Sequence, residues 1–254
     1  MTISHESDVD GLRRAGAVVA EARDRMCASV APGVSTGELD EIGRCILAKY
    51  GARSAPQLAY GFPGVTCISV NDELAHGIPS AERVLREGDL VNIDVSAELE
   101  GYWADTGASV PVGSVSRQAS SLLWATQQAL RDALSQARAG RPIREIGRAV
   151  ERRAKRSGLR VVRDLCGHGV GRHIHEEPSI PNVDRGAGRA QLWEGLVMTI
   201  EPFLTTSATT VVESSDGWTL RTPDGSRGAQ FEHTLIVTRG EPIILTLGAG
   251  TSAA

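Results

Sequence analysis

The side chains best suited to chemistry are acidic residues inside or at the ends of apolar runs. Asp94 lies in LVNIDV, where it shares one face of an alternating strand with Asn92. Glu100-Gly101 is a plausible two-residue turn, so Tyr102–Val110 would return as the partner strand and place Asp105 diagonally across from Asp94. Carboxylates about 7–8 Å apart at Cα repel each other unless a cation lies between them. A solvated hairpin pair explains the pattern equally well.

Three further candidate ligands lie in the second half of the chain. Glu201 ends the apolar run LVMTIEP, where Pro202 favours an extended backbone. Glu232 lies inside FEHTLIV, where an unpaired buried carboxylate is costly, although an exposed edge-strand position is the commoner explanation. His168 in CGHGVG is flanked by glycines that permit close approach to an ion. Four carboxylates and one histidine suit paired octahedral Mn, Fe or Co ions better than a tetrahedral structural zinc.

An internal repeat relates two of these carboxylates. Gly33–Gly51 resembles Gly140–Gly158, and both ends are separated by the same offset, since 140−33 and 158−51 equal 107. Asp94 and Glu201 share this offset, because 201−94 is also 107. A carboxylate kept at one place in both halves is better explained by a site on a symmetry axis than by solvation. We therefore predict a single domain, 1–254, built from pseudo-twofold-related halves of about 1–110 and 111–254.

The elements that must position these residues follow the same order in each half. Leu12–Ala31 and Ser120–Ala139 have apolar residues at helical spacing, and each is followed by a Gly/Pro turn and a second helix. Short β-type runs come next. They are Val65–Val70, Leu90–Val95, Val161–Leu165, Leu196–Ile200, Phe231–Val237 and Ile243–Leu247. This order predicts an α+β fold in which helices cover a curved antiparallel sheet.

Composition narrows the class of protein. A net charge of −4 over 254 residues predicts no broad basic surface and hence no nucleic-acid partner. The four cysteines lie far apart, which is typical of a reducing compartment. The N-terminus lacks a secretory pattern, and no apolar run approaches the roughly 20 residues of a membrane span. We therefore expect a cytoplasmic protein without a membrane partner, and a monomer.

Longer motifs carry a resemblance to type I methionine aminopeptidases, which have the pita-bread fold. The matching stretches are CISVNDELAHGIP (Cys67–Pro79), NIDVSAELEGYWADT (Asn92–Thr106), CGHGVGRHIHEEP (Cys166–Pro178), TIEP (Thr199–Pro202) and DGWTLRTPDGSRGAQFEHT (Asp216–Thr234). The resemblance implies removal of the N-terminal methionine from nascent proteins and peptides, with nascent chains near the ribosome as partners. It also implies two divalent metal ions (Co, Mn, Fe, Zn or Ni) held by the five residues above, with Asp105 and Glu232 bridging.

The same resemblance assigns roles around the metals. Glu201 would be the catalytic base, and His175 and His76 would be catalytic groups that also contact the substrate. The wall that binds the first side chain would consist of Phe62, Cys67, Ile174 and Trp218 beside the two histidines.

The chain departs from the family pattern in this wall. Pro56 and Ala59 stand where a cysteine and a tyrosine are expected, Phe62 replaces a second tyrosine, and Ile174 replaces an aromatic residue. The sequence therefore leaves open how tightly methionine is preferred, and whether this is the housekeeping enzyme or a specialised paralogue.

Four rival functions share this fold. An aminopeptidase with the same fold but another first-residue preference would share the ligands, and enzymes that cleave before proline usually carry a large extra N-terminal domain. A type II methionine aminopeptidase would have a helical insertion, for which the interval from Glu201 to Glu232 is too short. A non-catalytic pita-bread binding protein should have lost ligands, and all five are present.

Overall fold

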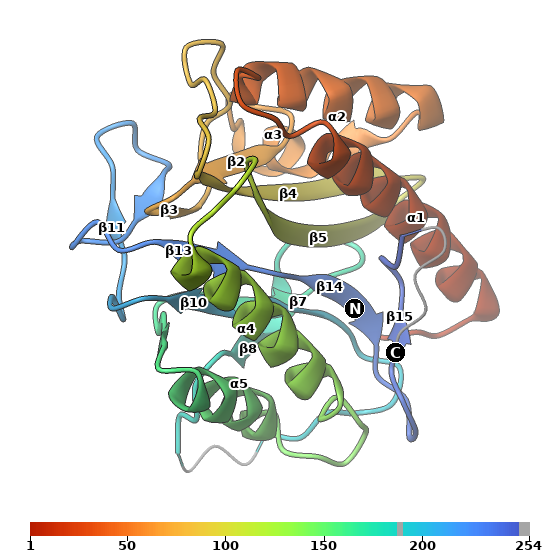
Figure 1. Ribbon diagram of the computed structural model, residues 1–254. Helices are drawn as coiled ribbons and strands as arrows, with labels where there is room; N and C mark the ends of the chain where they lie inside the picture. Colours follow the sequence, from red (N-terminus) through yellow and green to blue (C-terminus); the bar gives the residue numbers. More distant parts are fainter. Residues whose placement is uncertain (187–189, 249–254) are drawn as a thin grey trace.

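The computed structural model describes residues 1–186 and 190–248, and its fold is α+β, as the sequence predicts (Figure 1). Helices form two outer layers with the strands between them, so that α1 and α2 lie on one side and α4 and α5 on the other. No helix in the described ranges is long and apolar enough to span a membrane. The helices are α1 (Glu6–Ala28), α2 (Thr36–Tyr50), α3 (Ala55–Tyr60), α4 (Arg117–Leu134) and α5 (Arg144–Arg156).

Local signals explain where these helices begin and end. The Ser35 side chain accepts a hydrogen bond from the Glu38 N–H, and Glu38 accepts one in return from the Ser35 N–H, which forms a capping box on α2. α2 ends at Gly51, whose φ of 70° favours glycine. α1 begins before the predicted Leu12, because its first turn is polar and Asp8 accepts the backbone N–H of His5.

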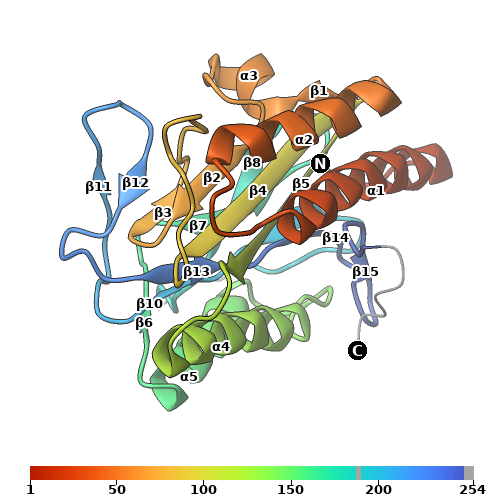
Figure 2. The same ribbon diagram turned by 45° about the horizontal axis from the view of Figure 1, so that its top comes forward.

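The central strands form a long hairpin, β4–β5, in which Asp94 pairs with Gly107 and Ser96 with Asp105. This register confirms the predicted diagonal placement of the two aspartates. The valines and isoleucine of β4 belong to the buried cluster that also contains apolar residues of α1 and α2, so the polar face of β4 turns toward the other half of the molecule. Figure 2 shows α1 and α2 on the same side of β4. The strands are β1 (Arg53–Ser54), β2 (Cys67–Val70), β3 (Glu73–Ala75), β4 (Leu90–Leu99), β5 (Tyr102–Pro111), β6 (Arg160–Val161), β7 (Cys166–Gly169), β8 (Glu176–Pro181), β9 (Val197–Ile200), β10 (Phe203–Thr205), β11 (Val212–Glu213), β12 (Leu220–Arg221), β13 (Gly228–Gln230), β14 (His233–Ile236) and β15 (Ile243–Ile244).

One predicted strand, Phe231–Val237, is shorter in the structure, where β14 covers only His233–Ile236. β13 pairs with β10, whereas β14 pairs with β9, and the chain changes partner between them. At the change the Glu232 N–H donates to the Gly107 carbonyl at 2.9 Å, which ties this segment to β5. The predicted runs Val161–Leu165 and Ile243–Leu247 are likewise shorter, since only β6 and β15 find strand partners.

Two large clusters of buried apolar side chains form the core, one under α1 and α2 and one under α4 and α5. A third cluster joins the two halves. It contains Leu12 and Trp103 from the first half and Val197 and Ile236 from the second. This shared packing fixes β4–β5 relative to β9 and β14, and therefore sets the distance between the acidic residues that each half contributes.

Candidate metal centre and peptide cavity

A cavity of about 480 Å³ lies where the two halves meet, and all the predicted site residues line it. The five candidate ligands come from three strands (β4, β5 and β7) and two strand junctions (β9–β10 and β13–β14), so only the folded chain brings them together. The site residues in the lining are Asp94, Asp105, His168, Glu201, Glu232, His76, His175, Phe62, Cys67, Ile174 and Trp218.

Asp94 and Asp105 project from the same face of the β4–β5 hairpin. The backbone of Asp105 is fixed by Thr234, whose hydroxyl accepts the Asp105 N–H at 3.0 Å and donates to its carbonyl at 2.7 Å. Burial raises the pKa of Asp94 to about 6, while a hydrogen bond with Asp105 opposes the rise. Burial, together with the charges of Glu232 and Asp94, raises the pKa of Asp105 well above its usual value.

Glu201 and Glu232 bring two more carboxylates from the second half. Glu201 follows β9, and Glu232 lies at the junction of β13 and β14, where only 1% of it is exposed. The Gln230 side-chain amide donates to one Glu232 oxygen at 3.0 Å. Burial comes first, and the neighbouring carboxylates second, in raising the pKa of both glutamates well above the usual range.

His168 completes the cluster from β7. Its Nδ1 lies 2.9 Å from the carbonyl of Gly169, so Nδ1 carries the proton and donates. Nε2 then keeps its lone pair and lies 3.8 Å from Asp105 and 3.7 Å from Glu201. Burial, reinforced by the nearby His175, lowers the pKa of His168 to about 3, which keeps the ring neutral and able to bind a metal.

These residues fit a divalent metal centre. Ligand atoms of Asp105, His168 and Glu232 lie within 4.8 Å of one another. Asp105 Oδ1 and Glu232 Oε1 are buried and find no hydrogen-bond partner among the residues that the structure describes, which is costly for a carboxylate without a cation. Among the described residues that line the cavity none is Lys or Arg, so no side chain neutralises the four carboxylates.

The two predicted substrate-contacting histidines lie at the mouth of the cavity. His76 has a φ of 56°, a left-handed conformation that costs energy in a residue other than glycine and is often found at functional sites. The ring of His175 packs edge-on against His168, with ring centres 4.3 Å apart. Partial burial and the neighbouring His76 lower the pKa of His175, so its imidazole is neutral at pH 7.

Tyr60 is a site residue that the sequence analysis missed. Its hydroxyl forms a hydrogen bond with His175 Nδ1, and the two rings lie 5.6 Å apart. Nothing in the sequence indicates this contact, because the two residues are far apart along the chain and α3 is only one short helical segment.

The predicted apolar wall is assembled on one side of the cavity. Phe62 is 3% exposed and meets the edge of Trp218 at a ring distance of 5.2 Å. Cys67 pairs across from Asp94, and burial raises the pKa of its thiol well above the usual value, so it presents an uncharged surface. Ile174 and Pro56 line the cavity, whereas Ala59 does not.

His233 turns away from the cavity, as its position next to Glu232 on a strand predicts. Its Nδ1 lies 2.8 Å from the hydroxyl of Thr246 on the opposite side of β14. His5 and His173 also lie outside the lining of this cavity.

Comparison with known proteins agrees with this site. Residues 10–239 match the model of metallopeptidase family M24. A Bacillus subtilis (strain 168) protein named methionine aminopeptidase 2 is 47% identical over 97% of this chain and 99% of its own length.

Solved structures give the same assignment. A methionine aminopeptidase from Thermotoga maritima superposes with a TM-score of 0.93 at 33% identity, over 97% of this chain and 99% of that one. A prolidase from Pyrococcus furiosus has a TM-score of 0.76 at 23% identity, over 98% of this chain and 66% of that one, and shares the fold. The chain therefore belongs to metallopeptidase family M24 and, within its pita-bread fold, to the methionine aminopeptidases.

Proposed function

We propose that this chain removes the N-terminal methionine from nascent proteins and peptides. The observation that carries the proposal is the cluster of four carboxylates and His168 beside an apolar pocket in a single cavity. We place the enzyme in the cytoplasm because its four cysteines are free, as is typical of a reducing compartment. We further propose that it is a monomer and acts on nascent chains near the ribosome.

We infer that two divalent ions bind at this site and that Asp94, Asp105, His168, Glu201 and Glu232 would hold them. The buried Oδ1 of Asp105 and Oε1 of Glu232 support this inference, since neither has a hydrogen-bond partner in the described part of the chain. Co, Mn, Fe, Zn and Ni all accept this donor set. When bound, such ions lower the pKa of a water molecule toward neutrality and polarise a carbonyl group.

The residues of this chain would perform the proton transfers. Glu201, with its raised pKa, would take a proton from the attacking water and pass it to the leaving amine. His175, neutral and held by Tyr60, would donate a hydrogen bond to the developing oxyanion. His76, which is solvent-accessible at the cavity mouth, would orient the peptide by contacting the scissile nitrogen.

The apolar wall would select the first side chain. Phe62 and Trp218 form an edge-to-face pair that suits a long, unbranched, polarisable side chain such as methionine. A panel of Met-Ala-X, Leu-Ala-X and X-Pro-Y peptides with added Mn, Co or Fe tests this selection. Cleavage of the Met peptide alone supports the proposal, cleavage of Leu peptides indicates an altered first-residue preference, and no cleavage with any metal contradicts it.

The assignment of the base is tested by Glu201→Gln, which keeps the shape of the side chain and removes its ability to take a proton. We expect the loss of at least about 100-fold in kcat, as for removal of a general base. Glu82→Gln, an exposed position, is the matched control. Near-normal turnover by a folded, metal-loaded Glu201→Gln protein would show that another group is the base.

A further inference from the structure

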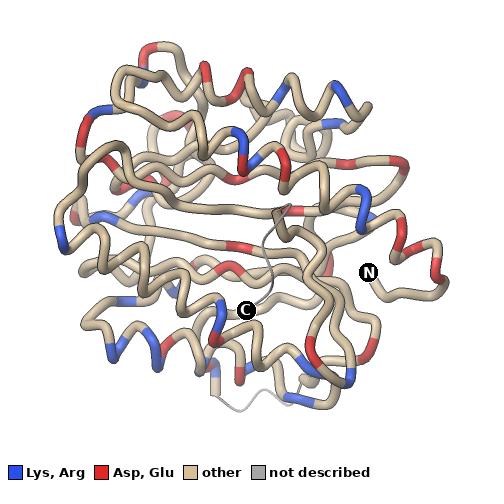
Figure 3. The backbone as a smooth tube through the Cα atoms, turned by 45° about the vertical axis from the view of Figure 1, so that its right-hand side comes forward, with Lys and Arg blue, Asp and Glu red and all other residues tan. Residues whose placement is uncertain are grey.

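The negative net charge of the chain conceals an uneven distribution. Residues 141–163 contain nine Lys or Arg residues but only two acidic ones, Glu145 and Glu151. They form α5 and β6, and Figure 3 shows positive residues gathered along this edge of the molecule. Helix α5 lies on the opposite side of the molecule from α1 and α2 (Figure 1), and β6 pairs with β10. Arg152, Lys155 and Arg160 do not line the peptide cavity.

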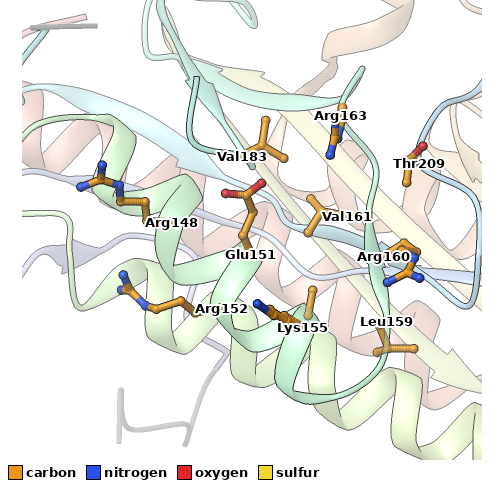
Figure 4. Close-up of a pocket in the computed structure, with 11 residues that line it drawn as sticks. Arg148, Glu151, Arg152, Lys155, Leu159, Arg160, Val161, Arg163, Val183 and Thr209 are labelled. Atoms are coloured by element: carbon orange, nitrogen blue, oxygen red, sulfur yellow. The ribbon is translucent and has the colours of Figure 1, made fainter. Parts of the chain in front are cut away.

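A groove of about 500 Å³ runs between α5 and β6 on this edge. We call it the basic groove, and the charged residues that line it are Arg148, Glu151, Arg152, Lys155, Arg160 and Arg163. Figure 4 shows Glu151 near the middle, Arg148 and Arg152 on one side of it, and Arg160 and Arg163 on the other.

Most of these cationic side chains form no ion pair in the part of the chain that the structure describes. Arg148 is held by Glu145 and Asp184. By contrast, Arg152, Lys155, Arg160 and Arg163 are exposed and form no ion pair or side-chain hydrogen bond with any part of the chain that the structure describes. Like charges held this close on one surface repel each other, so an anionic partner would relieve the repulsion.

The arrangement suits an extended anion with repeated charges better than a compact one. A single phosphate in the middle of the groove would meet the carboxylate of Glu151, which already accepts the backbone N–H of Asp184 at 3.1 Å. Phosphates along a chain could contact the cations on either rim and pass over Glu151. None of the exposed large apolar residues lines the groove, so it lacks the apolar anchor that stable membrane binding normally requires.

We propose that the basic groove binds the phosphate backbone of RNA. The contacts would be electrostatic and independent of base sequence, because arginine and lysine side chains on a rim reach phosphates rather than base edges. This partner goes beyond the peptidase activity, and it differs from the expectation drawn from net charge alone, because a local patch rather than the total charge meets the ligand.

The test measures binding of a fluorescein-labelled RNA hairpin by fluorescence anisotropy over a range of KCl concentrations. Three or four phosphate contacts predict a slope of log K against log salt of about −2 to −4. The triple variant Arg152→Glu, Lys155→Glu, Arg160→Glu should lose at least about tenfold in affinity and flatten this slope. The milder triple change to Gln should lose less, and serves if the reversal impairs folding.

A matched control carries the same change in net charge elsewhere. Arg13→Glu, Arg25→Glu, Arg86→Glu alters three exposed residues far from the basic groove. The proposal requires that this control bind RNA better than the groove variant and that both variants cleave Met peptides like the parent. Equal losses in the two variants, no RNA binding by the parent, or binding only to vesicles containing phosphatidylserine would overturn it.

Discussion

Burial shifts the pKa values of the side chains at the candidate metal centre, and the direction of the shift differs between the carboxylates and the histidine. Burial raises the pKa of all four carboxylates, so without a cation they tend to keep protons that a metal ligand must lose. His168 is the opposite case, since burial keeps it neutral and therefore ready to bind. The cluster therefore suits metal binding, and it lowers the stability of the metal-free protein.

The sequence predicts these residues unevenly. Asp94 and Asp105 follow from strand alternation and a tight turn, because their neighbours in space are also close along the chain. His168 and Glu232 have no such local signal, and only longer motifs identify them. Tyr60 could not be predicted at all, since its contact with His175 depends on how the two halves meet.

The Tyr60 contact gives a prediction at the residue scale. A neutral imidazole that donates from Nε2 must accept at Nδ1, and the Tyr60 hydroxyl is placed to donate there. Tyr60→Phe should keep the ring and lose this hydrogen bond, lowering kcat on a Met peptide by about 5- to 10-fold, as expected for about 1 kcal/mol. KM should change little, because the oxyanion forms only during reaction.

Tyr50→Phe is the control for this change, because the Tyr50 hydroxyl bonds to Glu21 on the exposed surface. Steady-state kinetics of both variants decide the matter. If Tyr60→Phe raises KM and leaves kcat intact, Tyr60 contacts the substrate and does not orient His175.

Among the elements, the junction between β13 and β14 determines where Glu232 lies. The chain leaves β10, crosses β5 and joins β9, and the residue at the crossing is Glu232, a proposed metal ligand. The apolar pattern here predicts a strand that begins at Phe231, two residues before β14. It cannot show a change of strand partner, because that depends on hydrogen bonds to β5, which lies in the other half.

Close packing at this crossing makes Gly107 sensitive to substitution. A Cβ at Gly107 would overlap the side chain of Gln230, which is 1% exposed and cannot swing away. Gln230 donates to Glu232, so Gly107→Ala should displace this proposed metal ligand. We expect a loss of about 1–3 kcal/mol in stability and about tenfold weaker metal binding.

Urea unfolding and metal titration by calorimetry measure both effects. Gly240→Ala is the control, because the nearest atom to its added Cβ lies 3.8 Å away. Unchanged metal affinity in Gly107→Ala would mean that Gln230 does not hold Glu232 in its binding position.

Across the whole molecule, the two halves meet at the acidic cluster. Asp94 and Asp105 belong to the first half, whereas His168, Glu201 and Glu232 belong to the second, and the repeat offset of 107 seen in the sequence relates Asp94 to Glu201. Four carboxylates with raised pKa values oppose this contact in the metal-free protein. A bound metal would attract the carboxylates of both halves, so the free energy of unfolding should rise with metal concentration.

Glu232→Gln separates these two effects, because it removes one buried charge and keeps the side-chain shape. The unfolded state releases the Glu232 proton near pH 4–5, whereas the folded state retains it to higher pH, so the wild-type protein loses stability as pH rises through that interval. In EDTA near pH 8 the variant should therefore be more stable than wild type by about 1–3 kcal/mol. The difference in stability should shrink as the pH is lowered. Both proteins contain the same histidines, so histidine titration does not contribute to this difference.

Bound metal should make wild type more stable than Glu232→Gln. A ligand at about 100 times its Kd adds about 2.7 kcal/mol to wild type, which corresponds to a rise in Tm of about 5–10 °C for a chain of this size. Glu232→Gln, which lacks a ligand, should gain much less from the same Mn concentration. Differential scanning calorimetry with and without Mn, at several pH values, measures the melting temperatures of both proteins in the metal-free and metal-loaded states. Equal melting temperatures in EDTA, or an equal gain from Mn in both proteins, would exclude a role for the Glu232 charge in joining the two halves.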